Sequence, residues 1–164
     1  MTGVILFAHG SLLCGAGQSL LVHAQRLRES GGAPIVEIGY LNYSEPRFIE
    51  AVARCAERGA TRIIVTPYFL IPGKFVSVDL PRAVAEAERQ FPALSFSVAS
   101  AIGFDERLAD ALISAAEGAK SEEAWGDALG EAVAFCRALP ECPLYETTAC
   151  PRGAKQREEV AQNV

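Results

Sequence analysis

An unbroken apolar run at residues 3–8, followed at once by His9-Gly10-Ser11, constrains the fold more than any other feature of this chain. A run of this length without alternating polar residues is typical of a strand buried on both faces. Such strands form parallel sheets covered by helices, and the ligands of these sheets bind beyond the carboxyl ends of the strands. The run therefore predicts that His9 lies at the ligand-binding edge of a parallel sheet. A neutral imidazole there can bind a divalent metal or accept a proton, or it can simply tie down the turn by hydrogen bonding.

The rest of the chain alternates between strand-like and helix-like patterns. Apolar and β-branched runs predict strands at residues 3–8, 34–40, 61–66 and 94–99. Apolar residues at helical spacing predict helices at residues 17–29, 46–58, 78–90 and 105–117. This order predicts an α/β fold, with a parallel sheet flanked by helices on both faces in a flavodoxin-type layering. Ser44-Glu45-Pro46 offers a polar cap and a first-turn proline for the second helix.

The length of 164 residues, half of them hydrophobic, fits one domain with a substantial core. We expect an α/β domain at residues 1–118. Residues 119–150 are expected to add a helix around Trp125 and a loop, which pack on that domain or on a partner. Residues 151–164 lack periodicity and are expected to form a mobile tail.

The charge and cysteine content exclude several classes of protein. A net charge of −5 provides no general positive field, so neither nucleic acid nor an anionic membrane is an expected partner. The first apolar run is too short for a secretory signal, and no stretch has the length of a membrane span. Five cysteines without a CxxC pair indicate reduced thiols rather than a secreted disulfide framework, so we expect a cytoplasmic protein. Among them, Cys55 lies in a helical pattern and is expected to pack in the core.

Two other features bear on the site. Residues 68–75 form a long apolar loop after the third predicted strand, and such a loop is more natural as the wall of a pocket than as open surface. His23 shares a predicted helix face with Leu20, Ala24 and Leu27, so we expect a packed, hydrogen-bonded histidine there rather than a ligand.

Four segments, in their order and spacing, resemble the sirohydrochlorin chelatase family. They are residues 5–11, 40–46, 59–70 and 73–81, and the likeness extends over about residues 3–104. The resemblance implies a lyase that inserts cobalt or iron into sirohydrochlorin or a related tetrapyrrole, for cobalamin or siroheme synthesis. The metal is then a substrate, with nickel left open, and no organic cofactor is expected. The resemblance also implies a homodimer.

Family members place a histidine after the first strand, an acid after the second and another histidine after the third. Carried over residue by residue, the first histidine is His9, while the acid falls at Asn42 and the second histidine at Phe75. An amide is not a base near pH 7, and a phenyl ring can neither bind a metal nor accept a proton. Glu45 is the nearby acid that could assist catalysis, or it could cap the second helix.

The remaining site residues are assigned to substrate binding. Gly10 and Ser11 form the turn beside His9, and Asn42 lies where the family has its acid. Phe75 can stack on the flat macrocycle, and Lys74 can meet one of its peripheral carboxylates, although Lys74 could equally be a solvated loop cation.

Two alternatives to an active chelatase stay open. The chain could be a tetrapyrrole or metal carrier on the same scaffold that has lost turnover, because a fold does not by itself imply a function. It could also hold a metal cluster on Cys136, Cys142 and Cys150, although their spacing matches no compact zinc or iron–sulfur pattern.

Overall fold

The structure is a computed structural model that describes residues 1–11, 17–119 and 121. The chain divides into two compact units, and each is treated by itself below. The first unit comprises residues 1–10 and 19–105, and the second comprises residues 11–18 and 106–164. Cys136, Cys142 and Cys150, the predicted helix around Trp125 and the predicted tail lie outside the described residues. The predicted boundaries at residues 118 and 150 stay predictions.

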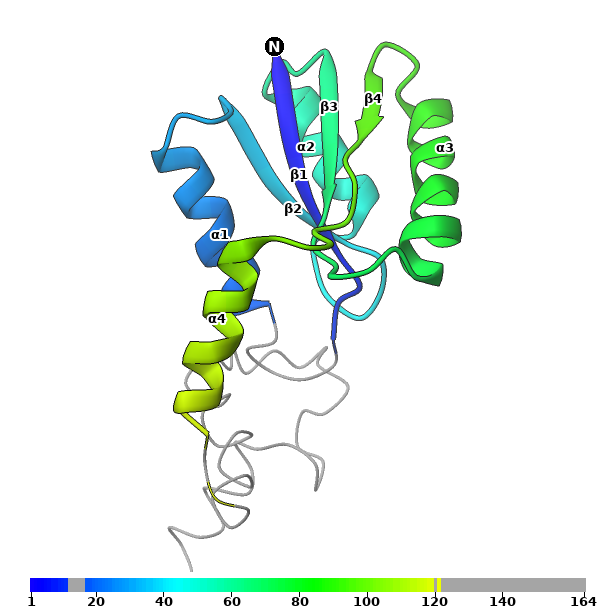
Figure 1. The fold of residues 1–164 in the computed structure, drawn as a ribbon. Coiled ribbons are helices and arrows are strands. Elements are labelled where there is room, and N and C mark those ends of the chain that lie inside the picture. The colour runs from blue at the N-terminus through cyan, green and yellow to red at the C-terminus, as the bar shows by residue number, and fades with distance from the viewer. Residues whose placement is uncertain (12–16, 120, 122–164) are drawn as a thin grey trace, which may run out of the picture. The chain divides into compact units, whose positions relative to one another are not determined.

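A four-stranded parallel sheet forms the centre of the first unit (Figure 1). Its strands are β1 (Thr2–Ala8), β2 (Ile35–Tyr40), β3 (Arg62–Pro67) and β4 (Ser95–Val98), in the order β2-β1-β3-β4. The apolar run of β1 lies between β2 and β3, where Phe7 pairs with Gly39 on one side and Pro67 on the other. The parallel sheet predicted from the apolar runs is therefore confirmed.

Helices lie on both faces of this sheet, as predicted. The helices are α1 (Gln18–Glu29), α2 (Phe48–Glu57), α3 (Leu80–Gln90), which follows the π-helical turn η1 (Phe75–Asp79), and α4 (Glu106–Glu117). α2 and α3 cover one face, and α1 covers the other (Figure 1). α4 belongs to the second unit. Among the residues that the structure describes, no helix is long and apolar enough to span a bilayer.

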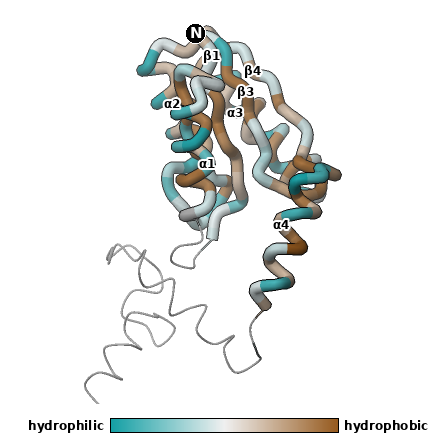
Figure 2. Tube along the Cα trace, turned by 60° about the vertical axis from the view of Figure 1, so that its left-hand side comes forward, coloured by the Kyte–Doolittle hydropathy of each residue, from teal (hydrophilic) through white to brown (hydrophobic). Residues whose placement is uncertain are grey.

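Two separate clusters of buried side chains fill the two faces of the sheet. The α2–α3 cluster consists of Ile5, Phe7, Ile35, Phe48, Ala51, Val52, Cys55, Ala60, Ile63, Val65, Leu80, Val84 and Ala87. The α1 cluster consists of Leu6, Leu20, Ala24, Val36, Ile38 and Tyr40. Neighbouring residues of a strand point to opposite faces, and β1 and β2 therefore supply both clusters, whereas the buried residues of β3 lie in the α2–α3 cluster. Brown, hydrophobic tube runs along the central strands in Figure 2, as this burial on both faces requires.

The predicted start of the second helix is wrong. The backbone N–H of Tyr40 donates to the carbonyl of Pro46 at 2.9 Å, so residue 46 continues the pairing of β2. Arg47 is still extended, and α2 begins only at Phe48. Ser44 and Glu45 therefore lie too far from the helix to cap it. Glu50 does so instead, because its carboxylate accepts the backbone N–H of Arg47 at 2.7 Å.

Candidate functional site

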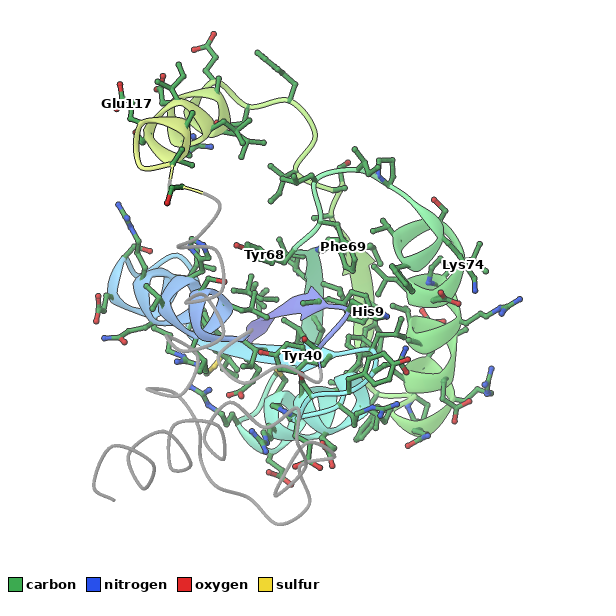
Figure 3. The ribbon with its side chains drawn as sticks, turned by 90° about the horizontal axis from the view of Figure 1, so that it is seen from below. His9, Tyr40, Tyr68, Phe69, Lys74 and Glu117 are labelled. Carbon is green, nitrogen blue, oxygen red and sulfur yellow. The ribbon has the colours of Figure 1, made fainter. Side chains whose placement is uncertain are left out.

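Three loops meet at the carboxyl edge of the sheet, and backbone hydrogen bonds hold them together. The loop after β2 donates from Leu41 to the carbonyl of Ala8 and from Asn42 to that of His9, both at 2.9 Å. The loop after β3 donates from Tyr68 to the carbonyl of Phe7 at 2.7 Å. The end of β1 is therefore fixed from both sides. Figure 3 looks onto this edge, with His9, Tyr40, Tyr68 and Phe69 labelled around it.

The half-buried imidazole of His9 contacts two aromatic rings. The ring of Phe75 lies 4.1 Å away between centroids, and that of Tyr43 lies 5.5 Å away. Nδ1 of His9 lies 3.1 Å from the carbonyl oxygen of Gly10. Since a carbonyl oxygen can only accept, Nδ1 carries the proton in this hydrogen bond and Nε2 of the neutral ring keeps its lone pair. Within the described residues nothing hydrogen-bonds to Nε2, so this atom can accept a proton or bind a metal.

Gly10 is required by the close approach of the loop after β2. Its φ is +89°, and a Cβ at this position would lie 1.7 Å from the carbonyl oxygen of Asn42. That same oxygen accepts the N–H of Ser44 at 2.7 Å. Any side chain at position 10 would displace the loop that carries Asn42 and Tyr43, so Gly10 positions the site through its lack of a side chain.

Phe75 is tied to the core through a series of rings. The ring of Phe69 lies 6.2 Å from that of Phe75 and 6.1 Å from that of Phe7, and Phe7 packs edge-on against Phe48 at 5.5 Å. Phe7 and Phe48 are buried, whereas Phe75 is 36% exposed. A continuous series of ring contacts thus connects the α2–α3 cluster to the imidazole of His9, and this packing fixes the orientation of the imidazole.

The other predicted site residues differ in their exposure. Glu45 and Lys74 are both exposed, and within the described residues neither forms an ion pair. Lys74 lies immediately before η1, next to Phe75. Ser11 and Asn42 are half-buried. No group of three or more His, Cys, Asp or Glu side chains able to hold a metal occurs in the described part of the chain.

The expectation for His23 is wrong. Its side chain is exposed on α1, and its ring lies 5.5 Å from that of Tyr68, which follows β3. The predicted helix face was too wide, because Leu27 is also exposed and only Leu20 and Ala24 are buried. Two further residues of this edge, Tyr43 and Tyr68, are not among the predicted site residues. Both lie in segments that carry the family resemblance, and Tyr68 opens the apolar loop of residues 68–75, which are the signals that could have found them.

Cys55 is fully buried, and its predicted role in core packing is confirmed. Burial, and to a smaller extent the nearby carboxylate of Glu37, raise the pKa of its thiol to about 11, against the opposing effect of Arg58. A protonated thiol under the sheet is a poor nucleophile and metal ligand. By contrast, Leu70 and Ile71 of the apolar loop are exposed, and the role of this loop as a pocket wall stays a prediction.

Comparison with known proteins identifies a family model and several relatives that this chain resembles. The CbiX family model matches residues 3–119. A sirohydrochlorin ferrochelatase of the Arabidopsis thaliana chloroplast is 29% identical over 146 residues, which cover 89% of this chain and 64% of the relative. A sirohydrochlorin cobaltochelatase of Methanocaldococcus jannaschii is 40% identical over 88 residues, covering 54% of this chain and 62% of the relative. The chain thus spans a little less than two thirds of each of these relatives.

A solved structure shares the fold. The sirohydrochlorin chelatase SirB from Bacillus subtilis subspecies spizizenii, solved in complex with cobalt, superposes with a TM-score of 0.67 at 24% identity. The match covers 85% of this chain and 63% of SirB. At this identity the superposition establishes only the fold of the chain. Any statement about its chemistry has to be argued from the residues at the carboxyl edge.

Proposed function

The chain belongs to the CbiX family of sirohydrochlorin chelatases, and on that basis we propose that it inserts a divalent metal into sirohydrochlorin or a closely related tetrapyrrole. The observation that carries the proposal is the position of His9. Its Nε2 is unengaged by the described residues, and its imidazole lies against Phe75 at the edge of the sheet where ligands bind. One atom able to bind a metal thus lies next to an aromatic surface that suits a flat macrocycle.

Metal insertion releases two pyrrole protons for each divalent ion that enters the ring. In our proposal Nε2 of His9 binds the incoming metal or accepts one of these protons. Glu45, which is exposed, is the nearest acid in sequence to the position where the family has its own, and we assign it or water to the remaining proton. Because His9 and Glu45 or water then accept the two protons, Asn42 acts only as a neutral hydrogen-bonding group.

Substrate contacts follow from the same three loops. We propose that Phe75 stacks on the macrocycle and that Lys74, exposed beside it, pairs with a peripheral carboxylate. Gly10, Ser11 and Asn42 shape the turn against which the substrate lies.

We propose cobalt or iron as the substrate metal, because the relatives are named cobaltochelatase or ferrochelatase. A single imidazole binds a divalent ion weakly, and a homodimer that brings two copies of His9 together would strengthen the site. Both this homodimer and a cytoplasmic location stay predictions.

The test is a direct insertion assay. Purified protein is mixed with sirohydrochlorin and Co²⁺ under anaerobic conditions, and the change in the absorption spectrum is followed against a protein-free control. We expect catalysed insertion that His9→Ala lowers by about 100-fold, the low end of what one acid–base group contributes. A wild-type rate equal to the protein-free rate would refute the proposal.

A second candidate function is a tetrapyrrole or metal carrier without turnover. It is favoured by Phe75 and Asn42, which stand where the family has a second histidine and an acid. Tight binding of sirohydrochlorin without any acceleration of insertion, and with unchanged affinity in His9→Ala, would establish the carrier instead.

A further inference from the structure

The two residues that follow β3 point to opposite sides of the sheet. The ring of Phe69 packs toward Phe7 and Phe75 on the α2–α3 side. The ring of Tyr68 instead lies 5.5 Å from the imidazole of His23 on α1. Figure 3 shows Tyr68 on the α1 side of Phe69. The two histidines of the chain therefore lie on opposite faces of the sheet, His9 with Phe75 and His23 with Tyr68.

Both aromatic pairs lie near the same end of the sheet. α1 begins beyond the end of β1, at the carboxyl edge, and runs back along the sheet (Figure 1). His23 is the sixth residue of this helix, which places it about 7.5 Å along the axis from the first residue, in the second turn. Tyr68 is anchored at the edge itself by its backbone hydrogen bond to Phe7.

The polar atoms of the His23–Tyr68 pair have no protein partner in the described part of the chain. His23 is exposed and Tyr68 is 39% exposed, and their rings meet at 46°. Within the described residues, neither side chain makes a hydrogen bond. A phenol O–H and an imidazole N–H are both donors, and side by side they suit an acceptor group such as a carboxylate. The ring contact orients these donors without occupying them.

We infer that His23 and Tyr68 bind a carboxylate arm of the tetrapyrrole on the α1 side of the carboxyl edge. The inference rests on the proposed function. Neighbouring strands lie about 4.8 Å apart, so a macrocycle of four pyrrole rings held at His9 extends beyond β1 and over β3, the strand that Tyr68 follows. Lys74 then meets the substrate on the α3 side, and the His23–Tyr68 pair meets it on the α1 side.

The test measures binding without metal. Uroporphyrin I, a fluorescent tetrapyrrole with acetate and propionate arms, is titrated with the full chain and with the variants His23→Ala, His23→Gln and Tyr68→Phe. We expect Kd to rise about 10-fold for His23→Ala and about 10-fold for Tyr68→Phe, as the loss of one hydrogen bond to a charged group predicts in each case. His23→Gln keeps a donor and should recover part of the affinity. The control is Val22→Ala, the neighbouring exposed residue of α1, which should leave Kd unchanged.

A second readout separates substrate contact from a structural effect. In the cobalt insertion assay, His23→Ala should raise KM and leave kcat within about twofold, because a contact made equally in the ground and transition states changes only binding. If wild type inserts cobalt but His23→Ala matches Val22→Ala in both Kd and KM, the inference fails and the proposed function stands. If wild type neither binds uroporphyrin I nor inserts cobalt, both fail.

Discussion

Within the described residues, the two faces of the sheet differ in the number of side chains that are buried against them. On the α2–α3 side thirteen residues form one buried cluster, and the rings of Phe69 and Phe75 extend it to His9. On the α1 side the described part of the chain contributes six buried residues, and within that part Leu21 and Val22 of α1 are exposed. The imidazole to which we assign the chemistry is thus supported by the larger core, whereas the His23–Tyr68 pair is supported by the smaller one.

This difference matches what each side must do. A group that meets a metal must hold its orientation closely, and packing against a large core restricts its motion. A group that binds a peripheral arm needs exposed donors more than a fixed position. The sheet therefore separates a tightly packed side for chemistry from an open side for recognition, and the variants below test that separation.

The largest effect is expected from truncating one buried residue on each face. Phe7→Ala should lower the free energy of unfolding by about 4 kcal/mol, because the ring is fully buried among Phe48 and Phe69. Leu20→Ala should cost about 2 kcal/mol, because α1 can settle into the smaller space. Urea unfolding followed by circular dichroism measures both values. Equal losses would show that the two faces do not differ in packing.

The second comparison uses two glycines with positive φ. Gly10→Ala places a Cβ against the carbonyl of Asn42 and should lower cobalt insertion about 100-fold, because a displacement of about 1 Å near the chemistry has effects of that size. Gly31→Ala, after α1, is the matched control, since its φ is +70° but no atom of the described residues lies within 4 Å of an added Cβ. The control should cost about 1 kcal/mol of stability and leave the insertion rate unchanged. Similar rates for the two variants would mean that the turn at Gly10 does not position the site.

The third prediction concerns the buried thiol of the α2–α3 cluster. Its pKa is raised from 9.0 to about 11 in the folded protein, so the unfolded chain ionises first as the pH rises. The stability that this thiol contributes is complete below pH 9 and is lost between pH 9 and 11, at about 1.4 kcal/mol per pH unit. The comparison is the unfolding free energy of wild type and Cys55→Ala across that range. Parallel curves would show that water reaches Cys55 and that this core is less dense than the structure indicates.

The smallest effect is expected from adding a second imidazole next to His9, on the α2–α3 side of the sheet. Phe75→His places it against His9, where the present ring centroids are 4.1 Å apart. Two imidazoles can share one metal ion, so the Kd for Co²⁺ should fall about 10-fold. Isothermal titration measures this change, and Phe75→Ala, which removes the ring without adding an imidazole, is the control that should leave the Kd for Co²⁺ unchanged. An unchanged affinity in Phe75→His would indicate that Nε2 of His9 does not face position 75.

The sheet and the position of His9 could be predicted because each depends on a short stretch of sequence. An apolar run such as residues 3–8 fits only a strand covered on both sides, and the residue after it must lie at the carboxyl edge. The start of α2 could not be predicted from Ser44-Glu45-Pro46, because a hydrogen bond between Tyr40 and Pro46 holds those residues in a bend at the end of β2. Similarly, Phe75 begins a π-helical turn rather than a loop, which sets the direction in which its ring points.

The exposure of His23 shows the same limit. The spacing of Leu20, Ala24 and Leu27 indicates a helix but not how much of its surface the sheet covers. The sheet buries Leu20 and Ala24 and leaves Leu27 and His23 outside, so His23 meets Tyr68 instead of the core.

By itself, the sequence determined the order of strands and helices along the chain, the burial of the sheet on both faces and the edge of the sheet at which His9 lies. Only the tertiary structure decided which rings touch that imidazole and that a second histidine lies on the other face beside Tyr68. The physical reason is the distance along the chain over which the sequence pattern carries information. Periodicity records the environment of neighbouring residues along one element, whereas a contact between loops depends on the register of several strands and on the phase of each helix.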